Sequence, residues 1–174
     1  MIRYFYTKEP KGCPTIGPRK KRIAEMDQII VFALDELVCA VPIHAVQRVI
    51  HAVEIKRLPK APEIIAGVIN VNGRIIPVVD IRKRFGFTSR EIDLDDQFVI
   101  ANTGKRVVAL WVDSVSGVRE IKPPQLTDTR ETLPFAKYIM GIGKVEDELI
   151  LIYDLEQFLN LEEEKELGQA MSNK

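Results

Sequence analysis

A hairpin-like unit that occurs twice is the feature of this chain that most limits its fold. The segment GVINVNGRIIPVVDI at 67–81 returns as GIGKVEDELILIYDL at 141–155, without a gap and at a constant offset of 74 residues. In the first copy, Asn72-Gly73 separates two β-branched runs. This dipeptide is the strongest short signal for a β-hairpin, because both turn positions need φ > 0. We therefore expect two similar β units within the chain.

A second correspondence lies upstream of each copy. Five apolar positions between 38 and 49 recur between 107 and 118 at an offset of 69 residues. Each half of the chain is thus expected to run strand, strand, short turn, strand, hairpin and then Asp. Pro77 cannot donate a backbone hydrogen bond to a neighbouring strand, so its strand is expected to lie at a sheet edge or to carry a bulge there.

Short β-type runs dominate the body of the chain, and few stretches have helical spacing. The runs lie at 28–34, 37–43, 49–58, 67–71, 74–79, 97–103, 106–113, 117–121, 138–145 and 148–154. Strands this short and this numerous predict an all-β fold made of small barrels or a sandwich. The repeat favours two similar barrels that pack side by side.

The chain is expected to have three regions. Residues 1–27, with the basic run RKKR, predict a flexible arm. Residues 28–160 form the body, as two pseudo-repeated barrel subdomains at roughly 28–90 and 91–160, with an exchange of strands between them left open. The last residues, 161–174, predict an acidic tail that is either helical or disordered.

The aspartate that closes each copy is best explained as a helix cap. Asp80 and Asp154 are each followed by apolar residues at helical spacing. Asp is a favoured N-cap because its carboxylate accepts a backbone N–H two or three residues on. A catalytic pair is disfavoured because neither aspartate lies in the Asp-Thr-Gly or Asp-Ser-Gly context of pepsin-like proteases. The basic run at 82–84 is expected to form the exposed face of the short helix after Asp80.

Composition and motifs disfavour several functional classes. The 25 basic and 25 acidic residues leave no net field to attract nucleic acid or an acidic membrane, and no apolar run approaches the roughly 18 residues that span a bilayer. His44 and His51 have no obvious third metal ligand, and no phosphate-binding loop or nucleophile motif occurs. We expect no catalytic residue, no metal and no cofactor. Without a secretion signal or a disulfide framework, the expected location is the cytoplasm.

Four longer segments carry a resemblance to a known family. IIVFALDELVCAVPIHAVQRVI, LPKAPEIIAGVINVNGRIIPVVDIRKRFG, RVVALWVDSVSGVREI and YIMGIGKVEDELILIYDLEQFL resemble the CheW-type chemotaxis coupling proteins in order and spacing, over about residues 28 to 160. No single motif is decisive. The combination of the proline-ended strand, the hairpin that ends in Asp-Ile-Arg, the V-D-x-V segment and the final glycine-rich hairpin is specific.

The resemblance implies two five-stranded, SH3-like β-barrels packed side by side, with a further apolar core between them. It also implies a non-catalytic adaptor that links the cytoplasmic tips of methyl-accepting chemoreceptors to the regulatory domain of a CheA-type histidine kinase, at membrane-associated arrays. Self-association in rings is a further implication, and neither nucleic acid binding nor membrane insertion is expected. Two alternatives stay open: an adaptor of a related kinase pathway for surface motility or gene regulation, and, more distantly, a nucleic-acid-binding barrel.

Carried over by position, the resemblance implies a set of receptor- or kinase-facing residues. They are Ile43, Val46, Arg48, Gly67, Asn72, Val118 and Gly141. For the two valines the alternative is plain core packing, and for the two glycines it is a backbone turn or bulge. The chain departs from the family pattern at Arg48, where an acidic residue is usual, and at Asn72, where a basic one is usual. The altered charge predicts a divergent set of partners.

Overall fold

The computed structural model describes residues 27–121, 126–127, 136–145 and 147–172. The strands are β1 (Gln28–Leu34), β2 (Leu37–Pro42), β3 (Val46–His51), β4 (Ile65–Val71), β5 (Arg74–Asp80), β6 (Gln97–Asn102), β7 (Val107–Val112), β8 (Ser114–Glu120), β9 (Leu126–Thr127), β10 (Ile139–Val145) and β11 (Glu148–Tyr153). The helices are α2 (Arg82–Phe85) and α3 (Leu161–Ser172), with 3₁₀ turns η1 (Ile43–Ala45), η3 (Ala136–Tyr138) and η4 (Leu155–Gln157). The basic arm lies outside the described residues.

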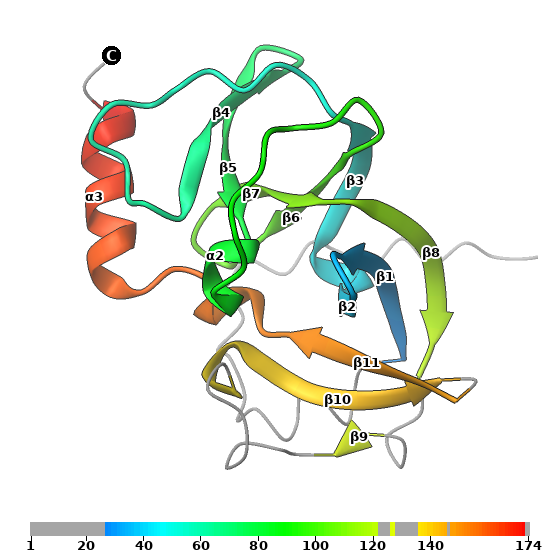
Figure 1. The fold of residues 1–174 in the computed structure, drawn as a ribbon. Helices are drawn as coiled ribbons and strands as arrows, with labels where there is room; N and C mark the ends of the chain where they lie inside the picture. The colour runs from blue at the N-terminus through cyan, green and yellow to red at the C-terminus, as the bar shows by residue number, and fades with distance from the viewer. Residues whose placement is uncertain (1–26, 122–125, 128–135, 146, 173–174) are drawn as a thin grey trace, which may run out of the picture.

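The strands form two sheets, which lie one above the other in Figure 1. Sheet A has the strand order β8-β1-β2-β11-β10-β9, and sheet B has the order β3-β6-β7-β5-β4. Most neighbouring strands are antiparallel, but β2 runs parallel to β11 and β5 runs parallel to β7. The all-β class predicted from the sequence is confirmed.

The two repeat units exchange strands with one another. The offsets found in the sequence relate β1, β2 and β3 to β6, β7 and β8, and β4 and β5 to β10 and β11. Sheet A joins the first two strands of the first unit to β8, β10 and β11 of the second, and sheet B joins β6 and β7 of the second unit to β3, β4 and β5 of the first. Neither sheet is therefore built from one consecutive half, 28–90 or 91–160.

The repeated hairpins agree in detail. Asn72 and Gly73 have φ angles of 51° and 82°, as the predicted two-residue turn requires. In β4 the pairing register with β5 shifts between Ile65 and Gly67. In β10 the register with β11 shifts between Ile139 and Gly141, at the equivalent place in the second copy. Each copy thus carries the same β-bulge, a device that bends a strand and increases its twist.

The prediction for Pro77 was wrong about the edge. Strand β5 is an inner strand, between β4 and β7, and the register shift opposite it lies in β4. Pro77 faces Val68, whose backbone N–H and C=O both bond to Lys56 at 2.8 Å and so point away from β5. Pairing with β7 begins only at Val78. The missing N–H of Pro77 therefore removes no hydrogen bond from either ladder.

Three apolar cores follow from the alternation of side chains along the strands. Ile150 and Ile152 of β11 lie in the core of sheet A, whereas Tyr153 belongs to a larger central core. The central core takes buried side chains from both sheets, such as Phe32 of β1 and Leu110 of β7. A third core lies in sheet B. The strands that contribute to two cores are buried on both faces.

The basic run after β5 is not the exposed face that the sequence predicted. The side chain of Arg82 is fully buried, with its Nε 3.4 Å from Asp35, its Nη2 bonded to Asp113 and its guanidinium carbon 5.2 Å from the Trp111 ring centroid. Arg84 is nearly as buried, and its Nε donates to the carbonyl of Phe158 at 2.9 Å. The Asp113 carboxylate and the Phe158 carbonyl offset part of the cost of burying these guanidinium groups, whereas Nε and Nη1 of Arg82 have no hydrogen-bond partner among the described residues.

Asp113 joins the two sheets at the end of β7. Its carboxylate accepts hydrogen bonds from the backbone N–H of Asp35 at 2.6 Å, from Arg90 at 2.6 Å and from Arg82. Its own N–H donates to the carbonyl of Ala33 in β1 at 3.1 Å. One side chain therefore ties the β1–β2 turn of sheet A to α2, to the following loop and to sheet B.

Asp96 anchors the loop between α2 and β6. Its buried carboxylate is bonded to Arg90 at 2.5 and 2.9 Å, to the backbone N–H of Asp93 at 2.7 Å and to Trp111 Nε1 at 2.9 Å. Burial alone would raise the pKa of Asp96, but these hydrogen bonds outweigh burial and hold the pKa below its usual value.

The tail was expected to be helical or disordered, and its described part is the helix α3. Asn160 and Glu163 form a reciprocal capping box, in which each backbone N–H donates to the other side chain at 2.8 Å. Leu167 is fully buried in the central core. Arg106 of the β6–β7 turn pairs with Glu164 at 2.9 Å. Capping, apolar packing and an ion pair thus hold α3 against the body (Figure 1).

Ala in place of Gly67 should destabilise the fold far more than Ala in place of Gly86. A Cβ on Gly67 would lie 2.4 Å from the Lys56 carbonyl oxygen, whereas one on Gly86 (φ 72°) would meet nothing within 4 Å. We expect G67A to lower the free energy of unfolding by at least about 2 kcal/mol, and G86A by about 1 kcal/mol from backbone strain alone. Urea unfolding followed by Trp111 fluorescence measures both, and equal losses would contradict the close approach.

Removing the charge of Asp96 should lower stability in a pH-dependent way. Because its folded pKa lies below the ordinary 3.8, the charge stabilises the fold above that pH, and this contribution is lost as the pH falls further. We expect D96N to cost about 2 kcal/mol at neutral pH, from hydrogen bonds to a charged group. The difference from the unmodified chain should shrink below pH 3.8. The control is D95N at the exposed neighbour, and a deficit that stays constant on acidification would refute the linkage.

Candidate functional site

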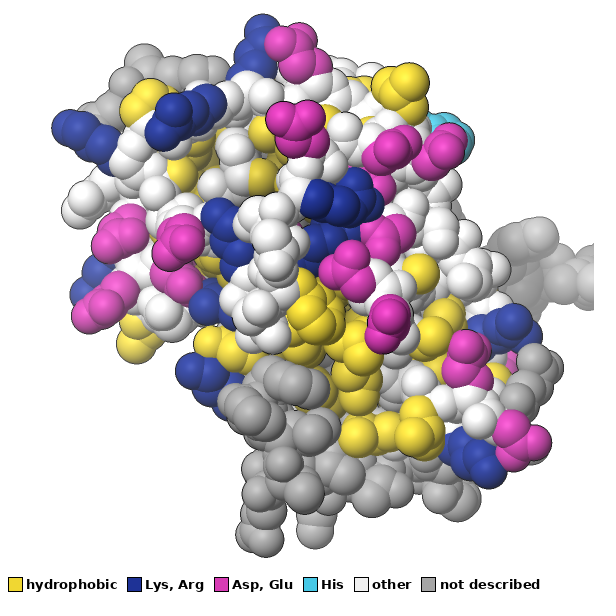
Figure 2. Space-filling model, viewed as in Figure 1, with side chains coloured by type: hydrophobic (Ala, Val, Ile, Leu, Met, Phe, Trp, Pro, Cys, Tyr) yellow, Lys and Arg dark blue, Asp and Glu magenta, His cyan; other side chains and the backbone are white. Residues whose placement is uncertain are grey.

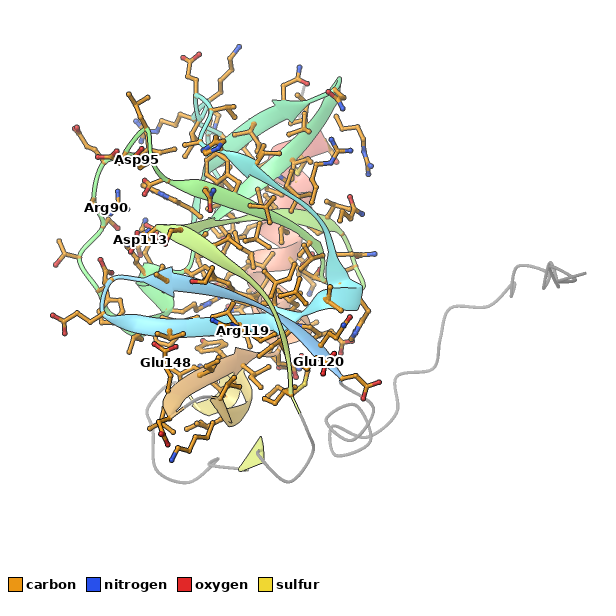
Figure 3. The ribbon with its side chains drawn as sticks, turned by 90° about the vertical axis from the view of Figure 1, so that its right-hand side faces the viewer. Arg90, Asp95, Asp113, Arg119, Glu120 and Glu148 are labelled. Carbon is orange, nitrogen blue, oxygen red and sulfur yellow. The ribbon has the colours of Figure 1, made fainter. Side chains whose placement is uncertain are left out.

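Two crossover segments lie on one face of the molecule. The chain passes from sheet A to sheet B through η1 and β3, and returns to sheet A through β8. Within the described residues, each crossover strand lies at the end of its sheet. Both strands lie on the side turned to the viewer in Figure 3. We call residues 43–51 and 114–120 the crossover face. End strands are natural docking sites for other chains.

The centre of this face combines apolar and charged side chains. Val118 is 50% exposed, and Arg48 on β3 is also exposed. Next to Val118 on β8, Arg119 and Glu120 are exposed as well, and Figure 3 labels both. An apolar patch with a charged surround is a common pattern in protein–protein interfaces.

Two of the predicted contact residues have a second, structural role. Ile43 and Val46 are half-buried, and both pack against the central core. They begin the first crossover, in η1 and at the start of β3. Substitution there would disturb the core together with the surface, so Val118 and Arg48 are the cleaner positions for testing the face.

The remaining predicted residues lie away from the crossover face. Gly67 and Gly141 are buried at the equivalent bulges of β4 and β10, where their backbones bend. Gly67 also packs against the backbone of Lys56. Asn72 is exposed in the β4–β5 turn. The structure thus places the two glycines inside the strands, and of the three residues only Asn72 presents a side chain to a partner.

The repeated aspartates are buried and make the hydrogen bonds of helix starts. Asp154 is the N-cap of η4 and accepts a bond from the backbone N–H of Glu156 at 3.3 Å. Asp80 lies two residues before α2, so the N-cap position falls on Ile81 and not on Asp80 as predicted. The Asp80 carboxylate nevertheless accepts from the backbone N–H of Arg82 at 3.2 Å and from the hydroxyl of Ser89 at 3.2 Å. At both sites the carboxylate helps to turn the chain from a strand into a helix.

Sequence reasoning missed Arg119 and Glu120 as members of the face. The strand at 117–121 was predicted, but nothing local shows that β8 pairs only with β1 among the described residues and leaves its other edge open. The signal that could have revealed them is the small number of apolar residues in this strand. A strand with few apolar residues cannot be a central strand buried on both faces.

A small pocket adjoins the crossover face at η1. It encloses about 270 Å³ between the two sheets. Its lining comes from η1, the β6–β7 turn, β10 and η4: Pro42, His44, Ala45, Asn102, Thr103, Gly104, Met140, Asp154, Leu155 and Glu156. The carboxylate of Asp154 is engaged in capping η4. A pocket of this size suits one apolar side chain of a docked protein better than a whole small-molecule substrate.

A second apolar surface lies below α2. Figure 2 shows a band of hydrophobic side chains that runs from α2 across β11 and β10. Leu149 of β11 is 66% exposed, and Leu151 and Phe85 are half-buried against the central core. The ring of Phe85 packs edge-on against Tyr153 at 5.3 Å between centroids. This band is a further candidate contact, on a different element from the crossover face.

Two searches of the described residues gave no candidate. No helix there is long and apolar enough to cross a membrane. No group of three or more His, Cys, Asp or Glu side chains in the described residues is placed to hold a metal ion.

Comparison with known proteins agrees with this geometry. The family described as the CheW-like domain matches residues 28–163. The chemotaxis protein CheW of Klebsiella aerogenes is 29% identical over 139 residues, which cover 78% of this chain and 83% of that protein. The chemotaxis protein CheW of Thermotoga maritima is 32% identical over 132 residues, which cover 76% and 87%.

A solved structure shares the fold. The crystal structure of the scaffolding protein TtCheW from Thermoanaerobacter tengcongensis matches with a TM-score of 0.73 and 31% sequence identity. The match covers 79% of this chain and 94% of that one. From the family match over most of its length, and from relatives in several bacteria, this chain belongs to the CheW-like family.

Proposed function

We propose that this protein is a non-catalytic scaffold of chemotaxis signalling, which couples methyl-accepting chemoreceptors to a CheA-type histidine kinase. Membership of the CheW-like family supports this function, and so do relatives named as chemotaxis proteins. The observation that carries the proposal furthest is the crossover face, with Val118 half-exposed on the end strand β8. A scaffold needs such accessible, partly apolar surface for a protein partner.

The crossover face is where we place the chemoreceptor. A chemoreceptor tip is a helical hairpin, and an end strand with a short apolar side chain lets a helix approach closely. Arg48 presents a positive charge on the β3 part of this face, so an acidic side chain on the receptor would be favoured there and a basic one disfavoured. The exposed Asn72 is uncharged in the β4–β5 turn, where the family resemblance implies a basic residue. Both changes favour a receptor set that differs from that of typical relatives.

The kinase and the cellular setting complete the proposal. The regulatory domain of the kinase is the second partner, and it is bound through a surface other than the crossover face. The protein acts in the cytoplasm, at membrane-associated receptor arrays, and joins rings with the kinase domain through contacts between barrels. A related kinase that controls surface motility or gene regulation would use the same two surfaces.

Direct binding to the kinase tests the coupling function. The purified full chain, mixed with the regulatory domain of a CheA-type kinase from the same organism at tens of micromolar, should elute earlier on size-exclusion chromatography than either protein alone. Regulatory domains of every CheA-type kinase in that organism form the test panel, so the result also identifies the pathway. If every pair elutes as separate proteins, the adaptor proposal fails.

A charge at Val118 should weaken receptor binding without unfolding the protein. V118E places a carboxylate in the apolar centre of the face, and because Val118 is half-exposed the fold should tolerate it. We expect the affinity for receptor-containing membranes to fall by at least about tenfold, or about 1.4 kcal/mol. V53E is the matched control, since Val53 is 42% exposed but lies after β3, outside the crossover face. Co-sedimentation measures both, and equal losses would contradict the assignment.

A further inference from the structure

The loop between α2 and β6 presents an apolar residue among acids. Leu94 is 91% exposed and Ile92 is 38% exposed. They alternate with Glu91, Asp93 and Asp95, which are exposed too. We call residues 91–95 the acidic loop. A large apolar side chain that is almost wholly in water, with a carboxylate on either side, has the composition of a docking segment for a basic surface with an apolar floor.

This loop is held in place rather than free to collapse. At its base the buried carboxylate of Asp96 is bonded to Arg90, to Trp111 and to the backbone N–H of Asp93. The carbonyl of Asp96 also accepts from the N–H of Ala52 at 2.8 Å. The exposure of Leu94 is therefore built into an anchored loop. A docking segment that is already ordered loses less conformational entropy when it binds.

A groove with a basic rim and an apolar floor lies beside α3, and these properties complement those of the acidic loop. It encloses about 660 Å³ between the segment before β4 and the helix, and we call it the α3 groove. Its lining consists of Lys56, Arg57, Leu58, Pro59, Lys60, Val68, Glu166, Gln169 and Ala170. Leu58, Val68 and Ala170 are the more buried members and form the floor. The three basic side chains are exposed at the rim, together with Pro59 and a single acid, Glu166. In Figure 2, basic side chains gather at upper left, above the acidic side chains of α3.

Lys60 lies at the rim of the groove in a backbone conformation that is unfavourable for lysine. Its φ angle is 61°, and it follows Pro59 in a turn closed by the bond from the Ala61 N–H to the Leu58 carbonyl. Glycine or asparagine is favoured at such a position. The other non-glycine residues with positive φ in the described part of the chain are Asp35, Asn72 and Asp147. Aspartate and asparagine tolerate this backbone better than other non-glycine residues, and lysine does not share that tolerance.

The α3 side of the groove is held by specific contacts and lies outside the family match, whereas the side formed by residues 56–60 and Val68 lies inside it. The capping box at Asn160, the ion pair from Arg106 to Glu164 and the buried Leu167 fix α3 against the body. The match to the CheW-like family ends at residue 163, so the helical side of the groove lies beyond it. The groove is therefore not a feature that membership of the family already accounts for.

We propose that the acidic loop of one molecule docks in the α3 groove of a second copy of this chain. Leu94 would bury its side chain on the apolar floor, and the acids on either side of it would face the basic rim. In Figure 3, Asp95 lies at the left edge while α3 lies behind the sheets, so the loop and the groove of one molecule are on different sides. The contact is thus between molecules and joins two different surfaces, which builds rows or closed rings of copies.

The contact is expected to be weak and sensitive to salt. A loop of this length buries less than the roughly 1,600 Å² of a standard stable interface. Opposite charges at an exposed rim are screened within about 8 Å at physiological ionic strength. This association is separate from receptor binding, because neither surface belongs to the crossover face. It adds a direct link between copies of the scaffold.

Sedimentation velocity on the full chain tests the proposal. From about 10 µM to about 1 mM protein at low salt, the weight-average mass should rise with concentration, and high salt should reduce the rise. L94D and K60E should each weaken the association by at least about tenfold. The control is L149D, which alters an apolar residue that is 66% exposed in the band below α2 and should associate like the unmodified chain. Thermal unfolding checks that all three variants are folded.

Mixing the two defective variants distinguishes this contact from any symmetric one. The L94D chain keeps its groove and the K60E chain keeps its loop, so an equimolar mixture should form dimers that grow no further. A chain that stays monomeric at the highest concentration overturns the proposal, and so does a mixture without dimers. A loss in L149D as large as that in L94D also overturns it, because association would then run through the other apolar surface.

Discussion

The central core between the sheets is the constraint on which the rest of the structure depends. It can form only if β1, β2 and β11 on one side, and β5, β6 and β7 on the other, are apolar on both faces, because each of these strands also lines the core of its own sheet. Burial along β7 is therefore almost continuous. The crossover strands β3 and β8 have few buried positions. The same packing that needs double-faced inner strands leaves the end strands accessible to partners.

Asp113 adds orientation to this core. Apolar packing favours burial but tolerates small rotations of one sheet against the other, whereas hydrogen bonds to a fixed carboxylate are directional. Asp113 sits where β7 passes into the second crossover and accepts bonds from the β1–β2 turn, from α2 through Arg82 and from Arg90. The buried Arg82 could not lose this partner without leaving a cation in an apolar setting, which is among the most costly changes in a core.

Local patterns in the sequence predicted the turns and hairpins well. The arrangement of distant segments was predicted only through the resemblance to a known family. The Asn72-Gly73 turn, the hairpins and the repeat offsets rest on residues close in the chain, and each has its counterpart in the strands. The burial of Arg82 depends on Asp113, and the conformation of Gly67 depends on Lys56, so no nearby pattern could reveal either. The exchange of strands between units is likewise invisible, because alternation shows which face is apolar but not which strand lies beside it.

The duplication explains how a small scaffold comes to have unlike surfaces. At the offset of 69 residues, Val118 of β8 corresponds to Val49 of β3, yet Val49 packs against the central core while Val118 is half-exposed. The two crossovers therefore have the same topology but different surfaces, with Arg48 on one strand and Arg119 and Glu120 on the other. A partner that lies across both edges, as proposed for the receptor, therefore meets two different sets of side chains and is held in one orientation rather than two.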